Sequence, residues 1–167
     1  AKAASGSFAA SSRKDRLGLL QAILDGLSAR ADEIAAAIME EMGAPYHLAQ
    51  AAHVPAGTRH FRTALEVLET FEFEKRQSTT LVVKEPIGPC ALITPWNWPL
   101  NQVAVKVAPA LAAGCTMVLK PSEIAPFDSM ILAEIIDAAG APAGVFKLVN
   151  GEGPTVGSAM ASQPDQT

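Results

Sequence analysis

Residues 84–126 read KEPIGPCALITPWNWPLNQVAVKVAPALAAGCTMVLKPSEIAP, and this stretch decides the fold class. It contains two short apolar segments, 90–94 and 116–119, that are typical of buried strands, and a third follows at 145–149. Helical patterns fill the two intervals between them, 99–112 and 127–139. Strands that alternate with single helices form βαβ units, in which the strands are parallel and the crossovers right-handed. The sequence therefore predicts an α/β fold with a parallel sheet.

The region upstream is predicted to be helical. From Ser12 onward, apolar residues recur at spacings of three and four, as they do along one face of a long helix. This stripe consists of Leu17, Leu20, Leu24, Leu27, Ala31, Ile34 and Ile38. Ser12 and Asp15 fit a capping box at the start of the helix, and Gly43 is expected to end it.

A segment with a different residue pattern lies between these helices and the parallel sheet. A second helix is predicted to begin near Pro55, because proline is tolerated in a first turn, and the β-prone residues 80–83 follow it. We expect the segment around them to form a strand or a hairpin arm. The predicted organisation is a helical region at 1–75, a β arm at 76–88 and part of a parallel-sheet domain at 89–167.

The composition excludes several classes of protein. Of the 167 residues, 49% are apolar and 18% are charged, which is too apolar for a disordered acidic tail. The net charge of -4 and 13 scattered basic residues give no electrostatic footprint for nucleic acid or for an anionic membrane. No apolar run reaches the roughly 18 residues that span a bilayer. Two cysteines without metal-site spacing favour a reducing, cytoplasmic setting.

The histidines and cysteines are expected to have structural roles. His53 and His60 are seven residues apart and could share a helix face, but no third ligand has matching spacing. We therefore expect no metal site and interpret both histidines as solvated or packing side chains. Cys90 and Cys115 lie at predicted buried strands, where packing is the ordinary role of a cysteine. An acyl transferase that uses Cys115 is disfavoured, because no histidine lies in the strand-end clusters.

A polar cluster follows each predicted strand at its carboxyl end. The clusters are TPWN at 94–97, KPSE at 120–123 and NGEG at 150–153. Because the carboxyl ends of parallel strands share one edge, where open α/β sheets bind ligands, we expect the clusters to converge there. The third continues as GEGPTVG at 151–157, whose glycines would let a backbone approach a pyrophosphate at a helix N-terminus. A plain strand-to-helix turn has the same signature.

Three side chains within these clusters suit particular chemistry. Lys120 offers a cation for a phosphate and Glu123 an acceptor for a ribose, although a surface ion pair is the simpler interpretation. Asn97 lies between two tryptophans and two prolines, in a stiff loop that would hold its amide as an oxyanion donor. A turn-capping asparagine is the ordinary alternative.

Taken together, these residues resemble the aldehyde dehydrogenase superfamily. The similarity runs from about Ser12 to the last residue, and it is strongest where 84–126 and KLVNGEGPTVG at 147–157 follow the order and spacing of the family's motifs. The resemblance implies that Asn97 is the oxyanion-stabilising amide and that Lys106 lies near the active site. The cofactor residues that it implies are Ile93, Thr94, Pro95 and Trp96 along the cleft, Lys120, Ser122 and Glu123 at the adenosine ribose, and Gly153 and Gly157 beside the adenine and pyrophosphate.

The resemblance also implies an activity and a fold. The activity is oxidation of an aldehyde to a carboxylic acid with NAD(P)+ through a cysteine thiohemiacetal. Glu123 favours NAD, with NADP as the alternative, because a carboxylate would repel a 2′-phosphate. The implied fold is N-terminal helices, one arm of an oligomerisation sheet and the first half of a Rossmann-like dinucleotide-binding domain. The implied partners are an aldehyde and, in the full-length form, other copies in a dimer or tetramer.

The family's nucleophilic cysteine and its glutamate base have no counterpart in this sequence up to Thr167. We therefore expect an internal segment of a longer enzyme, inactive alone, whose residues 161–167 stop in a loop before the sheet is complete. The alternative hypothesis is a non-catalytic fragment that binds nucleotide weakly or assembles with a longer homologue.

Overall fold

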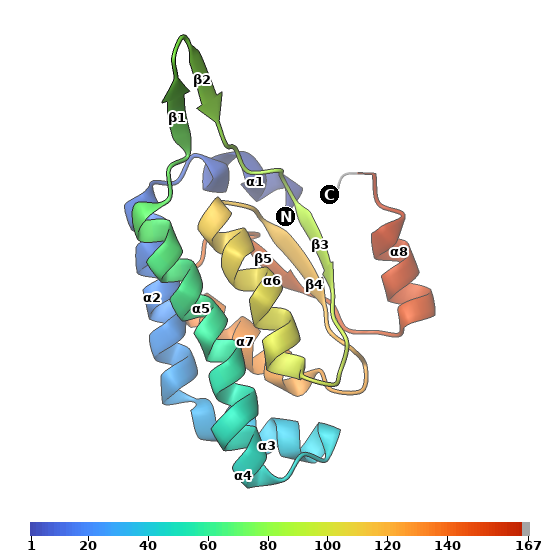
Figure 1. Ribbon diagram of the computed structural model, residues 1–167. Helices are drawn as coiled ribbons and strands as arrows, with labels where there is room; N and C mark the ends of the chain where they lie inside the picture. The colour runs from blue at the N-terminus through green and yellow to red at the C-terminus, as the bar shows by residue number, and fades with distance from the viewer. Residues whose placement is uncertain (165–167) are drawn as a thin grey trace.

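The computed structural model describes residues 1–164 and shows one body with a projecting hairpin (Figure 1). Within the body, helix α6 lies between helix α5 and the strands of a parallel sheet (Figure 1). Helix α2 packs against the other side of α5 and also contacts α6 and α7. The sheet is therefore one layer and the helices stack outward from it.

The parallel sheet has the order β3-β4-β5, and both of its strand pairs are parallel. The strands are β3 (Cys90–Ile93), β4 (Met117–Lys120) and β5 (Phe146–Leu148), and the helices that connect them are α6 (Pro99–Ala113) and α7 (Phe127–Ala138). Each of these five elements ends within one residue of its prediction. The βαβ succession expected from the sequence is confirmed.

The helices before the hairpin are more broken than expected. They are α1 (Lys2–Ala9), α2 (Arg13–Ala29), α3 (Ala31–Met42), α4 (Tyr46–Leu48), the π-helical turn η1 (Ala49–His53) and α5 (Val54–Thr70). The capping box at Ser12 and Asp15 and the left-handed Gly43, with φ 76°, are confirmed. The prediction of one helix between them is wrong, because Arg30 breaks it with φ -108° and ψ 20°.

The Arg30 side chain makes two ion pairs at this break. Its guanidinium binds Glu33 of α3 at 2.7 Å and Glu134 of α7 at 2.8 Å. The change of direction lets α3 pack on α7 while α2 packs on α5. Helix α2 contacts α7 as well, so the break extends the packing against α7 along α3. Tertiary contacts therefore override a continuous hydrophobic stripe.

The arm is an antiparallel hairpin of β1 (Glu74–Gln77) and β2 (Thr80–Val83), joined by a two-residue turn. All eight strand residues are exposed. The expectation of a strand or hairpin is thus met by a hairpin, while the division of the chain into 1–75, 76–88 and 89–167 stays a prediction. After β5 come η2 (Gly153–Gly157) and α8 (Ser158–Ala161). Of the predicted terminal loop at 161–167, residues 165–167 lie outside the described residues.

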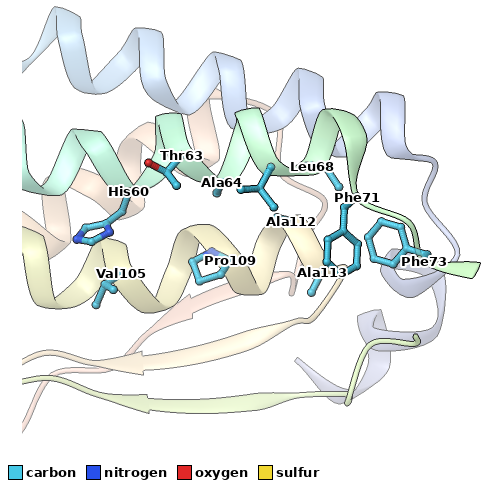
Figure 2. Close-up of a pocket in the computed structure, with 11 residues that line it drawn as sticks. His60, Thr63, Ala64, Leu68, Phe71, Phe73, Val105, Pro109, Ala112 and Ala113 are labelled. Atoms are coloured by element: carbon cyan, nitrogen blue, oxygen red, sulfur yellow. The ribbon is translucent and has the colours of Figure 1, made fainter. Parts of the chain in front are cut away.

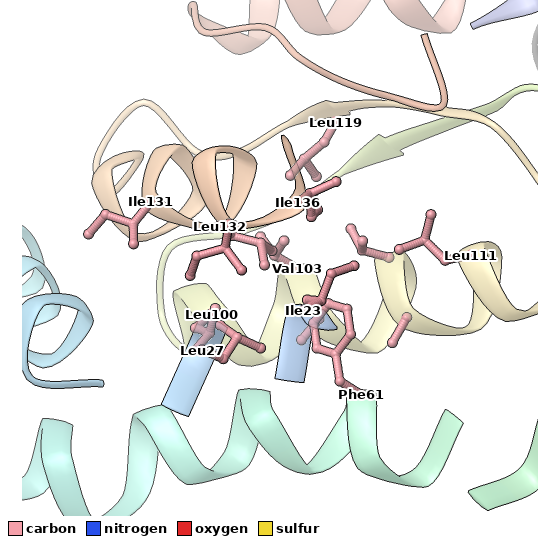
Figure 3. Close-up of a cluster of buried hydrophobic side chains, with 14 of the residues drawn as sticks. Ile23, Leu27, Phe61, Leu100, Val103, Leu111, Leu119, Ile131, Leu132 and Ile136 are labelled. Carbon is pink, nitrogen blue, oxygen red and sulfur yellow. The ribbon is translucent and has the colours of Figure 1, made fainter. Parts of the chain in front are cut away.

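One continuous apolar core joins the helices to the sheet (Figure 3). Phe61 of α5, Ile23 of α2 and Leu119 of β4 are fully buried in it. Helices α5 and α6 approach closely because Gly57 has no side chain: a Cβ there would lie 2.4 Å from Cγ of Leu100. In the part of the chain that the structure describes, no helix has the length and apolar character needed to cross a membrane.

Candidate functional site at the carboxyl edge of the sheet

The three polar clusters meet at one edge of the parallel sheet. The N–H of Thr94, just after β3, donates to the carbonyl of Lys120 at the end of β4 at 3.2 Å. On the other side, the N–H of Val149, just after β5, donates to the carbonyl of Leu119 at 2.9 Å. The carboxyl ends of all three strands are therefore adjacent, as parallel pairing requires.

Lys120 and Glu123 form an ion pair that is buried at one end and open at the other. The ammonium Nζ of Lys120 donates to Oε2 of Glu123 and to the carbonyl of Pro121, both at 3.0 Å. Lys120 is 2% exposed, whereas the side chain of Glu123 is 45% exposed. The interpretation as a surface ion pair therefore fits only the glutamate. Its own backbone N–H and then the Lys120 ammonium lower the pKa of Glu123.

The glycine-rich segment packs directly against this ion pair. A Cβ on Gly157 would lie 3.8 Å from Cδ of Lys120, so the bare backbone of η2 borders the lysine stem. The N–H of Gly153 also helps to lower the pKa of the Glu123 carboxyl. Upstream, Gly151 adopts φ 147°, and a Cβ there would lie 2.4 Å from Cγ2 of Val156. Four predicted cofactor residues, Lys120, Glu123, Gly153 and Gly157, thus form one cluster.

The remaining predicted cofactor residues have unequal surroundings. The hydroxyl Oγ of Ser122 accepts the N–H of Ile124 at 3.2 Å, so this serine holds the turn between Lys120 and Glu123. Thr94 is 4% exposed, and its Oγ1 has no hydrogen-bond partner within residues 1–164. Ile93, the last residue of β3, is exposed, and so are Pro95 and Trp96 after it. Residues 93–96 therefore form an open surface with one buried hydroxyl, that of Thr94, which has no hydrogen-bond partner within residues 1–164.

Asn97 and Lys106 lie on the element that follows β3. Asn97 is exposed, immediately before the N-cap residue Trp98 of α6, and its amide makes no hydrogen bond among the described residues. Lys106 is half-buried on α6, and no ion pair with it occurs within residues 1–164. Neither residue contacts the Lys120 cluster through a hydrogen bond in that part of the chain.

Contacts of the two histidines with the Asn97 loop were not foreseen. His53 is 3% exposed and stacks on Trp98 with ring centroids 4.1 Å apart and planes 16° apart. His60 places Nε2 2.8 Å from Oδ1 of Asn101. The packing interpretation is confirmed for His53, and the described residues contain no cluster of three metal-binding side chains. The spacing of His53, Gly57 and His60 on one helix face was the signal available in the sequence.

Both cysteines are buried and free, which agrees with the packing role predicted for them. Burial, with a smaller contribution from the neighbouring Cys115, raises the pKa of Cys90 to about 11. A thiol with that pKa is almost fully protonated at neutral pH and is a poor nucleophile.

The larger cavities lie away from the sheet edge. A cavity of about 420 Å³ lies between α5 and α6 and reaches the base of the hairpin (Figure 2). Apolar side chains such as Val67, Phe71 and Pro109 line most of it, and His60 and Thr63 add polar atoms. A second cavity of about 440 Å³ lies beside α2 and α5 and is bordered by Arg59 and Arg62. No predicted site residue lines either cavity.

Comparison with known proteins gives matches over nearly the whole chain. The model of the aldehyde dehydrogenase family matches residues 1–167. A 3-succinoylsemialdehyde-pyridine dehydrogenase from a Pseudomonas species is 58% identical over 155 residues, which are 92% of this chain and 32% of that protein. The crystal structure of a mutant aldehyde dehydrogenase C from Pseudomonas syringae, in complex with NAD+ and octanal, matches with a TM-score of 0.98 and 48% identity. That match covers 99% of this chain and 34% of the other.

A crystal structure with lower sequence identity also matches nearly the whole chain. A betaine aldehyde dehydrogenase point mutant from Staphylococcus aureus, in complex with NAD+, is 28% identical and matches with a TM-score of 0.94. The match covers 99% of this chain and 35% of that one. The chain thus spans about a third of the length of its relatives.

Proposed function

Because the chain belongs to the aldehyde dehydrogenase family, we propose that it forms part of the NAD(P)+ site of an enzyme that oxidises aldehydes to carboxylic acids. It also supplies the oxyanion donor, while the cysteine nucleophile and the general base lie outside this chain. The observation that carries the proposal is the cluster of Lys120, Glu123, Gly153 and Gly157 at the carboxyl edge of the sheet. Open α/β sheets bind dinucleotides at this position.

The chemistry of the cluster fits the adenosine half of NAD+. The open Glu123 carboxylate, whose pKa is lowered, accepts hydrogen bonds from the ribose hydroxyls. Lys120 has three N–H donors and uses two of them within residues 1–164, which leaves a third for a ribose oxygen. The glycine backbone of η2 leaves room for close approach of the cofactor. A carboxylate at this position opposes the 2′-phosphate of NADP, so NAD is the preferred cofactor.

Asn97 acts on the substrate side of the same edge. When bound, NAD+ supplies the hydride acceptor for the reaction. The exposed Asn97 amide donates its N–H to the oxygen that becomes negative when the nucleophile adds to the aldehyde. The prolines on both sides of the loop limit its motion, so the donor is held before the charge develops. The proposal also assigns Lys106, which lies on α6, to the surroundings of the active site.

The proposal includes a cytoplasmic homo-oligomer, a dimer or tetramer, that acts on an aldehyde and binds neither nucleic acid nor membranes. The exposed hairpin supports assembly, because Leu81 and Val83 are each 48% exposed on β2, a strand whose pairing within residues 1–164 is with β1. An exposed edge strand with apolar side chains is a template for pairing with another chain.

A titration of the 167-residue chain with NAD+, followed by NMR, tests the cofactor site. We expect shifts at the amides of residues 94, 120, 123, 153 and 157. Glu123→Gln should weaken binding about ten-fold or more, because hydrogen bonds to a charged group are worth about 1.5–3 kcal/mol. Glu66→Gln, on the exposed face of α5, is the matched control and should change nothing. Shifts confined to other residues, or equal affinity of Glu123→Gln, would show that the cofactor site is wrong.

A further inference from the structure

We propose that His53 is a positioning residue for Asn97: its imidazole, stacked on Trp98, holds the loop that carries the Asn97 amide. This inference rests on the proposed oxyanion role of Asn97. His53 contacts neither the cluster at Lys120 nor Asn97 itself through a hydrogen bond in the described residues, so it acts through Trp98.

The stack joins two parts of the chain that are far apart in sequence. The ring centroids of His53 and Trp98 lie 4.1 Å apart and their planes differ by 16°, so the rings lie face to face. Trp98 is the N-cap residue of α6, and its own side chain makes no capping hydrogen bond within residues 1–164. Because the position of Trp98 fixes where α6 begins, its contact with His53 also fixes the residue before it, Asn97.

Two neighbouring contacts come from the same face of α5. Gly57, four residues after His53, allows Leu100 to approach its backbone so closely that a Cβ would clash at 2.4 Å. His60, three residues further on, binds Asn101 at 2.8 Å. Residues at spacings of four and three lie on one side of a helix. Together these residues hold 98–101, the loop end and the first turn of α6.

The local backbone and the burial of His53 favour this role. His53 is the last residue of the π-helical turn η1, and such turns are frequent at functional sites. Its Nδ1 is buried without a partner among residues 1–164, and burial lowers its pKa, so the ring is neutral at neutral pH. A neutral planar ring stacks on an indole without the cost of burying a charge. Only His53 is the buried partner of the stack: Trp98 is 38% exposed, and Pro95, Trp96 and Asn97 before it are exposed as well.

Two variants of the 167-residue chain test whether the flat ring of His53 positions the Asn97 loop or whether any apolar side chain of similar size would serve. His53→Leu keeps an apolar side chain of similar size without a flat ring, whereas His53→Phe keeps the flat ring. The exposed His47→Ala is the matched control. We measure backbone order parameters at Asn97 and Trp98, and exchange of the Gln102 amide, which donates to the carbonyl of Trp98 at 2.9 Å. The Cys90 amide, bonded to Thr116 within the sheet, reports on the rest of the fold.

In His53→Leu we expect the order parameters at Asn97 and Trp98 to fall from about 0.85 to below about 0.6. Exchange of the Gln102 amide should become about two-fold to ten-fold faster, the range that follows from the energy of an aromatic pair. His53→Phe and His47→Ala should keep the wild-type values, and the Cys90 amide should not change in any variant. In a Trp96→Phe background, emission from Trp98, which is already 38% exposed, should shift further to the red in His53→Leu only.

Equal order parameters in wild type and His53→Leu would overturn the proposal, and so would a loss of order in His53→Phe as large as in His53→Leu. Faster exchange at Cys90 as well as at Gln102 would show that His53 is merely structural. These readouts do not depend on catalysis. If His53→Leu loosens the loop while Asn97→Ala leaves turnover of a complete enzyme unchanged, the positioning of the loop stands and the proposed role of Asn97 fails.

Discussion

A buried carboxyl group at the start of α7 should make the protein less stable as the pH rises from about 4 to 7. Asp128 is fully buried, and its Oδ2 has no hydrogen-bond partner within the described residues. Its Oδ1 lies 3.4 Å from Oγ of Ser129, a weak contact. Burial is the main cause that raises its pKa from the ordinary 3.8 to about 7. Glu41 of α3 lies nearby and accepts the N–H of Phe127. Its carboxylate repels a negative charge on Asp128 and so also raises the pKa of Asp128.

The direction of the effect follows from the two pKa values. Below pH 3.8 the carboxyl is protonated in both the folded and the unfolded chain, so it has no effect on the balance between them. Between 3.8 and about 7 only the unfolded chain releases the proton, and the free energy of unfolding falls with rising pH. Above pH 7 the loss is complete. At about 1.4 kcal/mol per unit of pKa difference, the full loss is about 4 kcal/mol, of which about 2.5 kcal/mol falls between pH 5 and pH 8.

Urea unfolding at pH 5 and at pH 8 measures this effect. Asp128→Asn keeps the shape of the side chain but cannot ionise, so the difference in unfolding free energy between the two pH values should shrink by about 2.5 kcal/mol relative to wild type. Comparing these differences cancels the other titrating groups and any constant cost of the amide. Asp137→Asn, on the exposed side of the same helix, should retain the wild-type pH dependence. The same pH dependence in wild type and Asp128→Asn would refute the reasoning.

Three further predictions concern packing, reactivity and catalysis. Gly57→Ala should destabilise the chain by about 1–3 kcal/mol in urea, because its Cβ would meet Leu100, whereas Gly18→Ala has open space and should be neutral or stabilising by up to about 1 kcal/mol. Cys90 should react with iodoacetamide at pH 8 far more slowly than free cysteine until urea unfolds the chain, and equal rates in the two states would contradict its burial and raised pKa. In a complete enzyme that contains this segment, Asn97→Ala should lower kcat by about 10²–10³-fold with little change in the affinity for NAD+, and unchanged turnover would exclude the oxyanion role.

The parallel sheet could be predicted from the sequence because its information is local. Each strand is a short apolar segment, and each connecting helix ends at a glycine with positive φ, Gly114 at 88° and Gly140 at 82°. Once the strands are known to be parallel, their carboxyl ends must share one edge, and the three polar clusters must meet there. The contact between Lys120 and Gly157 therefore follows from topology, although the residues are 37 positions apart in the chain.

The broken helix at Arg30 could not be predicted in the same way. The apolar stripe continues through Ala31 and Ile34 at helical spacing, and nothing in the local sequence demands a stop. The break coincides with contacts that are remote in sequence: α3 packs on α7, and the carboxylate of Glu134 on α7, about a hundred residues away, binds the Arg30 guanidinium. Helix α1 was missed for a related reason. Its segment has few large apolar residues, and only Phe8 among them is buried.

Lys120 and His53 differ in whether their place in the fold could be predicted from the sequence. Lys120 belongs to a strand end, so its place follows from the order of the strands. His53 stacks on Trp98, which lies at the start of a different helix, α6. This contact depends on how α5 and α6 cross. The crossing depends in turn on Gly57, because the lack of a side chain there lets Leu100 contact the backbone of α5. Periodicity identifies the helix face that carries His53, Gly57 and His60, but it cannot identify the surface that this face meets. The residues that hold the Asn97 loop can therefore be identified only from the packed structure. The cluster of Lys120, Glu123, Gly153 and Gly157 at the strand ends, by contrast, follows from the order of the strands.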